Sequence, residues 1–211
     1  MYTLYYSPGT ASLAVHLALL EIGAPYQLEL VDFERQSQRS ESYLRLNPLG
    51  QVPTLVIDGI AHTESAALLM MLADRHPEAQ LAPAPGTAGR YEWYQWLVFQ
   101  SNALGASFRN WFYPQELGAA EHPPPLRAAL QSRIEGLWTR VDAQLAARGP
   151  YLLGDKFSAA DLLLIMYMRW SRKMPRTALE WPALRKFATL ARARTSWQRL
   201  CDIENLSEWR S

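Results

Sequence analysis

The stretch that decides the fold covers residues 47–55 and reads Asn-Pro-Leu-Gly-Gln-Val-Pro-Thr-Leu, with Gln51, Val52 and Pro53 at its centre. The second proline stands directly before a short apolar run, and a residue without an N–H cannot contribute a donor to a sheet. We therefore expect a turn that ends at Pro53, followed by a strand. If the Val52–Pro53 bond is cis, the N–H and C=O of Val52 turn outward and could pair with a peptide-like ligand as a short added strand. The alternative is an ordinary turn with a trans bond.

A second informative pair, Glu64-Ser65, follows Pro53 where a predicted hairpin gives way to a helix. Serine is a favoured helix N-cap, and the free N–H groups of a first helical turn suit a carboxylate. The carboxylate of Glu64 could in turn receive an ammonium group. Together the two residues suit the two charges at the α-carbon of an amino acid. The alternative is a plain helix cap beside a solvated glutamate.

Working outward from these motifs, the first half of the chain alternates short strands with helices. Aromatic and alternating runs predict strands, three- to four-residue apolar spacing predicts helices, and Asp58-Gly59 is a strong hairpin signal. Gly23 is the expected C-cap of the first helix. The expected strands are 2–6, 26–31, 54–57 and 60–63, and the expected helices are 12–21 and 65–76. The order is a parallel βαβ unit, an irregular helical piece and then ββα.

The second half is predicted to be helical almost throughout. A proline-rich linker at 81–86 precedes it. The clearest helical run has apolar residues at Leu130, Ile134, Leu137, Val141 and Leu145. The segment 162–168 is apolar nearly all round, which indicates a helix at the centre of its domain. Before it, Ser158 and Asp161 have the spacing of a capping box, for which we expect a structural role.

Composition excludes several classes of function. The formal charge is +1, from 21 basic and 20 acidic residues, which gives no reason to expect nucleic acid as a partner. No window reaches the ~18 apolar residues of a membrane span, and the start lacks the pattern of a signal peptide. The single cysteine, Cys201, cannot form an internal disulfide, and the histidines show no metal-ligand spacing. We therefore expect a cytoplasmic protein without a metal site or a membrane partner.

The two motifs, the order of elements, the linker and the helical half together resemble the cytosolic glutathione S-transferase superfamily across the whole chain. The resemblance implies a thioredoxin-like α/β domain (βαβ-α-ββα) at 1–79 that binds glutathione, a linker at 80–87 and an all-α domain at 88–211. In that family the residue at Val52, with Gln51 and Pro53 on either side, pairs with the cysteinyl backbone of glutathione. The residues at Glu64 and Ser65 hold its γ-glutamyl end.

The opening segment, 5–14, is most similar to the bacterial beta class of that superfamily. That class usually has a cysteine where this chain has Ala11, so a mixed disulfide with the protein is excluded there. It also often carries a His-Lys pair where Gly105 and Ala106 stand. The activity implied by the resemblance must therefore use other groups on the sulfur.

Hydroxyl groups are the remaining candidates for activating a thiol. An unperturbed thiol has a pKa of about 8.5, and a hydroxyl donor at a helix N-terminus lowers that value. Ser12 and Thr10 fall at the expected strand-to-helix turn, and Tyr6 ends the strand before it. We rank Ser12 first, Thr10 second and Tyr6 third. The alternative is that Ser12 only N-caps the helix.

An aromatic run at 91–113 follows the linker and supplies candidates for the second substrate. Most of these rings are expected in the core or at a subunit interface. By resemblance, Phe108, Arg109, Trp111 and Phe112 would wall the pocket of a small hydrophobic electrophile. Arg109, Arg35 and Arg39 are possible partners of the glycyl carboxylate of glutathione, or else solvated surface arginines.

The resemblance implies a homodimer that takes part in detoxification, uses glutathione as co-substrate and keeps no permanently bound cofactor. The first hypothesis is an enzyme that adds the glutathione thiolate to an apolar electrophile. A second is a non-catalytic binding or regulatory protein of the same fold, which the missing cysteine favours. A third is a glutathione-dependent disulfide or peroxide reductase, in which two glutathiones react in turn.

Overall fold

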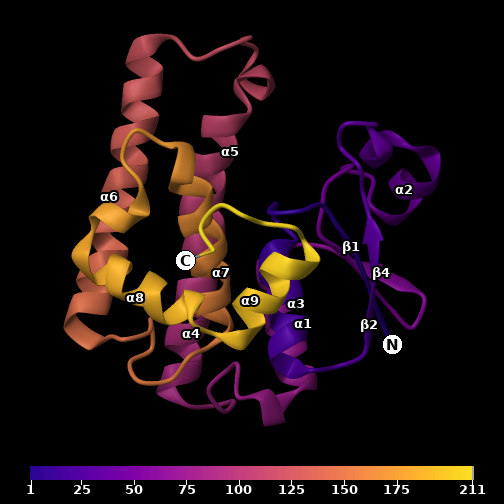
Figure 1. Cartoon of the computed structure of the whole chain (residues 1–211), viewed down its shortest axis with the longest axis horizontal. Coiled ribbons are helices and arrows are strands. Elements are labelled where there is room, and N and C mark those ends of the chain that lie inside the picture. Colours follow the sequence, from indigo (N-terminus) through magenta and orange to yellow (C-terminus); the bar gives the residue numbers. More distant parts are fainter. Residues whose placement is uncertain (211) are drawn as a thin grey trace. The chain divides into compact units, whose positions relative to one another are not determined.

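The structure is a computed structural model that describes residues 1–210 (Figure 1). Its N-terminal part is built on a mixed sheet with the strand order β2-β1-β3-β4. The strands are β1 (Tyr2–Tyr6), β2 (Tyr26–Leu30), β3 (Thr54–Ile57) and β4 (Ile60–His62). β1 runs parallel to β2 and antiparallel to β3, and β3 runs antiparallel to β4. The predicted βαβ unit and hairpin are therefore confirmed.

Local residue choices explain these elements. Gly23 ends α1 (Leu13–Ile22) with a φ of 72°, and its N–H donates to the carbonyl of Leu19. The hairpin turn places Asp58 at a φ of 52° and Gly59 at 82°, which are conformations that Asp and Gly tolerate. The helical pieces associated with the sheet are α1 (Leu13–Ile22), η1 (Ser37–Arg39), α2 (Glu41–Leu46), α3 (Ser65–Arg75), η2 (Pro77–Ala79) and α9 (Thr195–Ile203).

The chain forms two compact units. One comprises Met1–Ala82 together with the described chain from Arg192 onward, and the other comprises Pro83–Ala191. The expected domains assigned the whole C-terminal segment to the helical part, whereas its last helix packs with the sheet-containing unit. The reason is that α1 contacts α9 from the C-terminal segment as well as α3 from the N-terminal part (Figure 1).

The second unit is helical. Its elements are α4 (Ala88–Phe99), η3 (Gln100–Gly105, a π-helical turn), α5 (Ala106–Phe112), η4 (Pro114–Leu117), α6 (Pro124–Arg148), α7 (Ala159–Trp170), η5 (Ser171–Lys173), η6 (Ala178–Glu180) and α8 (Pro182–Arg192). As expected from its composition, α7 is the central helix, with every residue from Ala159 to Arg169 buried. One detail of the predicted apolar face of α6 was wrong, because Trp138 is buried there instead of Leu137.

A capping box begins α7. One oxygen of the fully buried Asp161 accepts hydrogen bonds from the backbone N–H and the hydroxyl of Ser158, at 2.8 and 3.0 Å. Its other oxygen accepts the N–H of Leu152 at 2.9 Å. These bonds satisfy a buried carboxylate, which supports the structural role expected for this residue.

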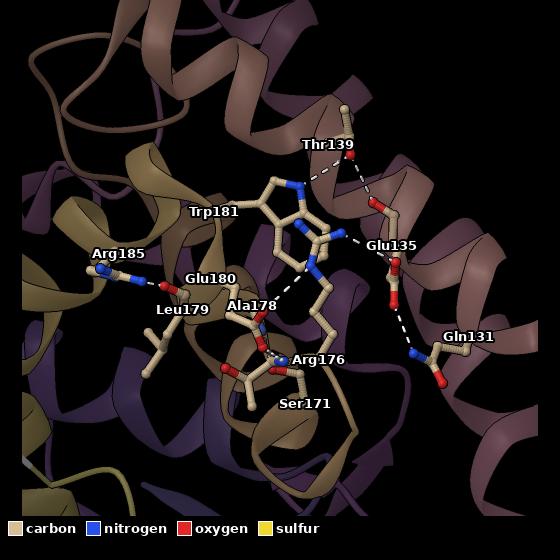
Figure 2. A network of polar contacts seen from close by, with 11 residues as sticks. Gln131, Glu135, Thr139, Ser171, Arg176, Ala178, Leu179, Glu180, Trp181 and Arg185 are labelled. Atoms are coloured by element: carbon tan, nitrogen blue, oxygen red, sulfur yellow. Dashed lines mark hydrogen bonds and ion pairs between the residues drawn. The ribbon is translucent and has the colours of Figure 1, made fainter.

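The connection between α7 and α8 is tied to α6 through Arg176 and Trp181 (Figure 2). The guanidinium carbon of Arg176 lies 4.0 Å from the centre of the Trp181 ring, and a guanidinium nitrogen donates to Glu135 of α6 at 3.3 Å. The indole N–H of Trp181 donates to Thr139 of α6 at 3.1 Å.

Among residues 1–210, none of the helices combines the length and the apolar character that a membrane crossing requires.

Candidate functional site

Val52 presents an unused backbone edge. The Val52–Pro53 peptide bond is cis, and the side chain of Val52 is buried in a small cluster with Val31 and Tyr43. Within residues 1–210, the N–H and the C=O of Val52 make no hydrogen bond. A residue with its side chain inside and both backbone groups unpaired can accept an extended peptide as an added strand.

Glu64 and Ser65 stand at the start of α3, but the N-cap residue is Glu64 and not Ser65 as expected. Glu64 occupies the N-cap position at a φ of 71° and a ψ of 104°, and Ser65 is the first helical residue. The left-handed φ of a glutamate carries a conformational cost, and such strain is concentrated at functional sites. The hydroxyl of Ser65 donates to the carbonyl of Ala11 at 2.9 Å instead of capping the helix.

The start of α3 keeps groups available for a ligand. Glu64 is exposed, and its carboxylate forms no hydrogen bond or ion pair with any described residue. The first N–H groups of a helix lack intrahelical partners and favour an anion. This end of α3 can therefore hold a carboxylate and an ammonium group side by side.

The turn between β1 and α1 holds the candidate hydroxyls, and Ser12 is fully buried in it. The hydroxyl of Ser12 donates to the carbonyl of Ser7 at 3.1 Å and accepts the N–H of Ser7 at 3.2 Å. It makes no capping hydrogen bond to α1, so the simple N-cap alternative is not what the structure shows. Thr10 is half-buried, and its hydroxyl donates to the same carbonyl at 2.7 Å.

Tyr6 is the third candidate and remains half-buried. Its hydroxyl makes no hydrogen bond within the described part of the chain. Burial, and then the negative charge of Glu204, raise the pKa of this phenol above its ordinary value. The phenol is therefore protonated at neutral pH, and it can donate a hydrogen bond but cannot act as a base.

These segments meet at one end of the sheet. Tyr5, the last residue but one of β1, pairs with Thr54 at the start of β3, so the turn after Tyr6 and the residue before Pro53 lie at the same end of the sheet. The bond from Ser65 to Ala11 joins α3 to the same place. The structure thus brings together the predicted hydroxyls, Val52 and Glu64.

A buried polar network supports this end of the unit, and it was not foreseen from the sequence. His16 of α1 contacts Glu204 at 2.7 Å and the Tyr26 hydroxyl at 3.0 Å. The second oxygen of Glu204 accepts the N–H of Gly9 at 2.7 Å. Because Gly9 and Glu204 lie 195 positions apart, no local pattern could have indicated the contact.

The residues expected around the electrophile lie in the helical unit, and two of the four are core residues. Phe108 and Trp111 are buried, whereas Phe112 is 43% exposed. Arg109 forms a two-pronged ion pair with Glu116, at 2.7 and 2.5 Å. Of this group, Phe112 offers the largest apolar surface for a ligand.

The two other candidate arginines differ in position. Arg35 is highly exposed and pairs with Asp32 at 3.5 Å. Arg39 lies beside the loop before Val52, where one of its guanidinium nitrogens is 3.3 Å from the place a Cβ on Gly50 would take. Arg39 is thus the better placed of the two for a ligand on Val52.

Among residues 1–210, no group of three His, Cys, Asp or Glu side chains is arranged to hold a metal ion.

Comparisons with known proteins agree with this arrangement. Residues 10–75 match the model of the glutathione S-transferase N-terminal domain, and residues 112–194 match that of the C-terminal domain. Glutathione S-transferase GST-4.5 of Xanthomonas campestris pv. campestris is 36% identical over 174 residues, which cover 81% of this chain and 82% of the relative. The chain belongs to the glutathione S-transferase family.

Solved structures show the same fold. A glutathione transferase of Methylococcus capsulatus superimposes with a TM-score of 0.88 at 32% identity, covering 98% of this chain and 100% of that one. A sphingomonad glutathione S-transferase complexed with glutathione gives 0.86 at 31% identity, covering 97% and 100%. The bacterial beta-class enzyme of Sphingomonas chungbukensis gives 0.84 at 29% identity, covering 97% and 99%. The thioredoxin-like fold with a helical second part, and the likeness to the beta class, are thereby confirmed.

Proposed function

We propose that this chain binds glutathione through Val52, Glu64 and Ser65, flanked by Gln51 and Pro53, and adds its thiolate to a small apolar electrophile. The observation that carries the proposal is the unpaired backbone of Val52 at the same sheet end as the free start of α3. Val52 would pair with the cysteinyl backbone. Glu64 would take the γ-glutamyl ammonium group, and the first turn of α3 would take its carboxylate.

The thiol would then lie near the turn from Ser7 to Ser12, where the N-terminal end of α1 favours negative charge. Thr10 and Tyr6 are partly exposed, whereas Ser12 is not, so we place Thr10 and Tyr6 ahead of Ser12 as donors to the sulfur. If Thr10 turns its proton to the thiolate, the hydroxyl of Ser12 still donates to the carbonyl of Ser7. That rearrangement leaves no buried acceptor unpaired.

The test is calorimetric titration of glutathione into the wild type and Glu64→Ala, with conjugation of a chlorodinitrobenzene measured on the same samples. Loss of a charge-assisted contact corresponds to roughly a 10- to 100-fold weaker affinity. Glu29→Ala, at another exposed glutamate of the same unit, is the matched control and should bind like the wild type. The absence of saturable binding at millimolar glutathione would refute the proposal.

A second candidate, a glutathione-binding protein without turnover, is favoured by Ala11 and by the burial of the Ser12 hydroxyl. Saturable binding without conjugation would support it. Thiol exchange with a small disulfide, if faster than conjugation, would instead support the reductase.

We also infer that the protein works as a homodimer. One face of α4 exposes Tyr91, Tyr94 and Val98, with exposed fractions of 68%, 38% and 56%. Their spacing of three and four residues makes a continuous apolar stripe, of the kind that marks an interface. Sedimentation of the wild type and of Val98→Glu tests this inference, because a charge there should shift the protein towards the monomer.

A further inference from the structure

Two buried polar side chains converge on a single backbone carbonyl, that of Gln51. The hydroxyl of Tyr43 donates to it at 2.6 Å, and the amide nitrogen of Asn47 donates to it at 2.7 Å. Tyr43 and Asn47 expose only 5% and 4% of their surface. Two donors on one carbonyl, one from α2 and one from the residue that follows it, hold that oxygen toward the interior.

Both donors are themselves held in place. The hydroxyl of Tyr43 also contacts the fully buried hydroxyl of Thr54 at 2.9 Å. The side-chain oxygen of Asn47 accepts the N–H of Leu49 at 3.1 Å, and its backbone N–H donates to Tyr43 at 2.9 Å. Burial raises the pKa of Tyr43, outweighing the opposing hydrogen bonds from Thr54 and Asn47, so its hydroxyl stays protonated as a donor.

The carbonyl of Gln51 shares its peptide group with the N–H of Val52. This bond is trans, because Val52–Pro53 and Gly149–Pro150 are the cis bonds of the described chain. In a planar trans peptide the C=O and the N–H point in opposite directions. Donors that pull the oxygen of Gln51 inward therefore aim the N–H of Val52 outward.

We propose that Tyr43 and Asn47 are positioning residues that orient the peptide group between Gln51 and Val52 so that the Val52 N–H meets the cysteinyl carbonyl of glutathione. The inference rests on the proposed function and deepens it. Neither side chain touches the ligand in this scheme. They affect binding through one backbone hydrogen bond, so their replacement should not affect a ligand that lacks this bond.

A ligand that cannot form this hydrogen bond therefore tests the inference. The probe is a glutathione analogue in which an alkene isostere replaces the cysteinyl-glycine peptide group, which removes the carbonyl acceptor without adding charge. For the wild type we expect the analogue to bind about fivefold more weakly than glutathione, the equivalent of one neutral hydrogen bond. The ratio of the two dissociation constants is the quantity to measure by calorimetry.

The variants are Tyr43→Phe, Asn47→Ala and the double variant. Each single change should weaken the binding of glutathione about twofold to threefold, and the double change about fivefold, because no more than this one hydrogen bond can be lost. Binding of the analogue should barely change, so the ratio should fall towards about one in the double variant. Tyr2→Phe is the matched control, since Tyr2 is buried and its hydroxyl bonds His76 and Arg75 at the other end of β1. Its ratio should equal that of the wild type.

The outcomes separate this inference from the proposed function. If the wild type binds glutathione but the variants weaken the binding of glutathione and of the analogue by equal factors, Tyr43 and Asn47 have only a structural role and the inference is wrong. Unchanged glutathione affinity in the double variant overturns it as well. If the wild type binds no glutathione at all, the proposed function fails and this inference fails with it. Should the double variant not fold, Tyr43→Phe alone carries the comparison.

Discussion

Gly50 stands in the loop before Val52, and its replacement by alanine gives the sharpest test of the structure around the site. Its φ is +62°, and an added Cβ would lie 2.8 Å from the backbone carbonyl oxygen of Gln38. Real Cβ atoms do not approach a carbonyl so closely, and a backbone atom cannot rotate away as a flexible side chain can. The loop or the turn at Gln38 must therefore move.

The expected loss of stability is the sum of two contributions. A left-handed φ costs a non-glycine residue about 1–2 kcal/mol. Forcing extra volume into a packed contact costs about 1–3 kcal/mol more. Gly50→Ala should therefore lower the free energy of unfolding by roughly 2–5 kcal/mol. Displacement of the loop should also weaken the proposed binding of glutathione.

Two other glycines separate these contributions. Gly59 has a φ of +82° but nothing within 4 Å of an added Cβ, so Gly59→Ala should lose only the backbone contribution. Gly136 in α6 has open space and no left-handed φ, so Gly136→Ala should stabilise the protein by about 0.5–1 kcal/mol. The assay is urea denaturation followed by circular dichroism, with glutathione calorimetry on the folded variants. Equal destabilisation by Gly50→Ala and Gly59→Ala would refute the argument from the close contact.

Asp161→Ala should lower the free energy of unfolding by about 3–5 kcal/mol, because it leaves several buried donors unpaired, and thermal unfolding with the exposed Asp155→Ala as control checks this. Arg176→Ala should cost no more than about 1 kcal/mol, less at high salt, because its ion pairs are partly exposed; a larger loss in urea denaturation would contradict this. Burial alone would raise the pKa of Glu21, but hydrogen bonds from Arg194 and Ser196 and the charge of Arg194 outweigh it and lower the pKa. The stability this gives is present at neutral pH and is lost as the pH falls below the ordinary carboxyl range, so the melting temperatures of the wild type and Glu21→Gln should differ at pH 7 and converge in acid.

Much of the fold could be predicted because its signals are local. The Asp58-Gly59 turn, the Gly23 cap and the capping box before α7 each depend on residues within a few positions, and the structure has all three. Helix faces were less certain. In α6, two adjacent residues compete for the core, and the larger ring of Trp138 is the buried one.

The segments that meet at the candidate site could be predicted from the sequence. Val52 and Glu64 stand in conformations that leave groups free for a ligand, and the roles suggested for them stay predictions. The hydroxyls were harder to rank, because sequence position says which residues share a turn but not which oxygen is turned inward. Ser12 is buried against the backbone of Ser7, and this lowers its rank.

Short-range preferences of the backbone are enough to predict the order of strands and helices, the position of the hairpin and the motifs at Val52-Pro53 and Glu64-Ser65. Tertiary packing, in contrast, brings Glu204 of the C-terminal segment to Gly9 and His16, and brings Tyr43 and Asn47 to the carbonyl of Gln51. Such contacts form because a buried polar group must find a partner wherever the fold brings one within reach, and that choice is made by packing in three dimensions.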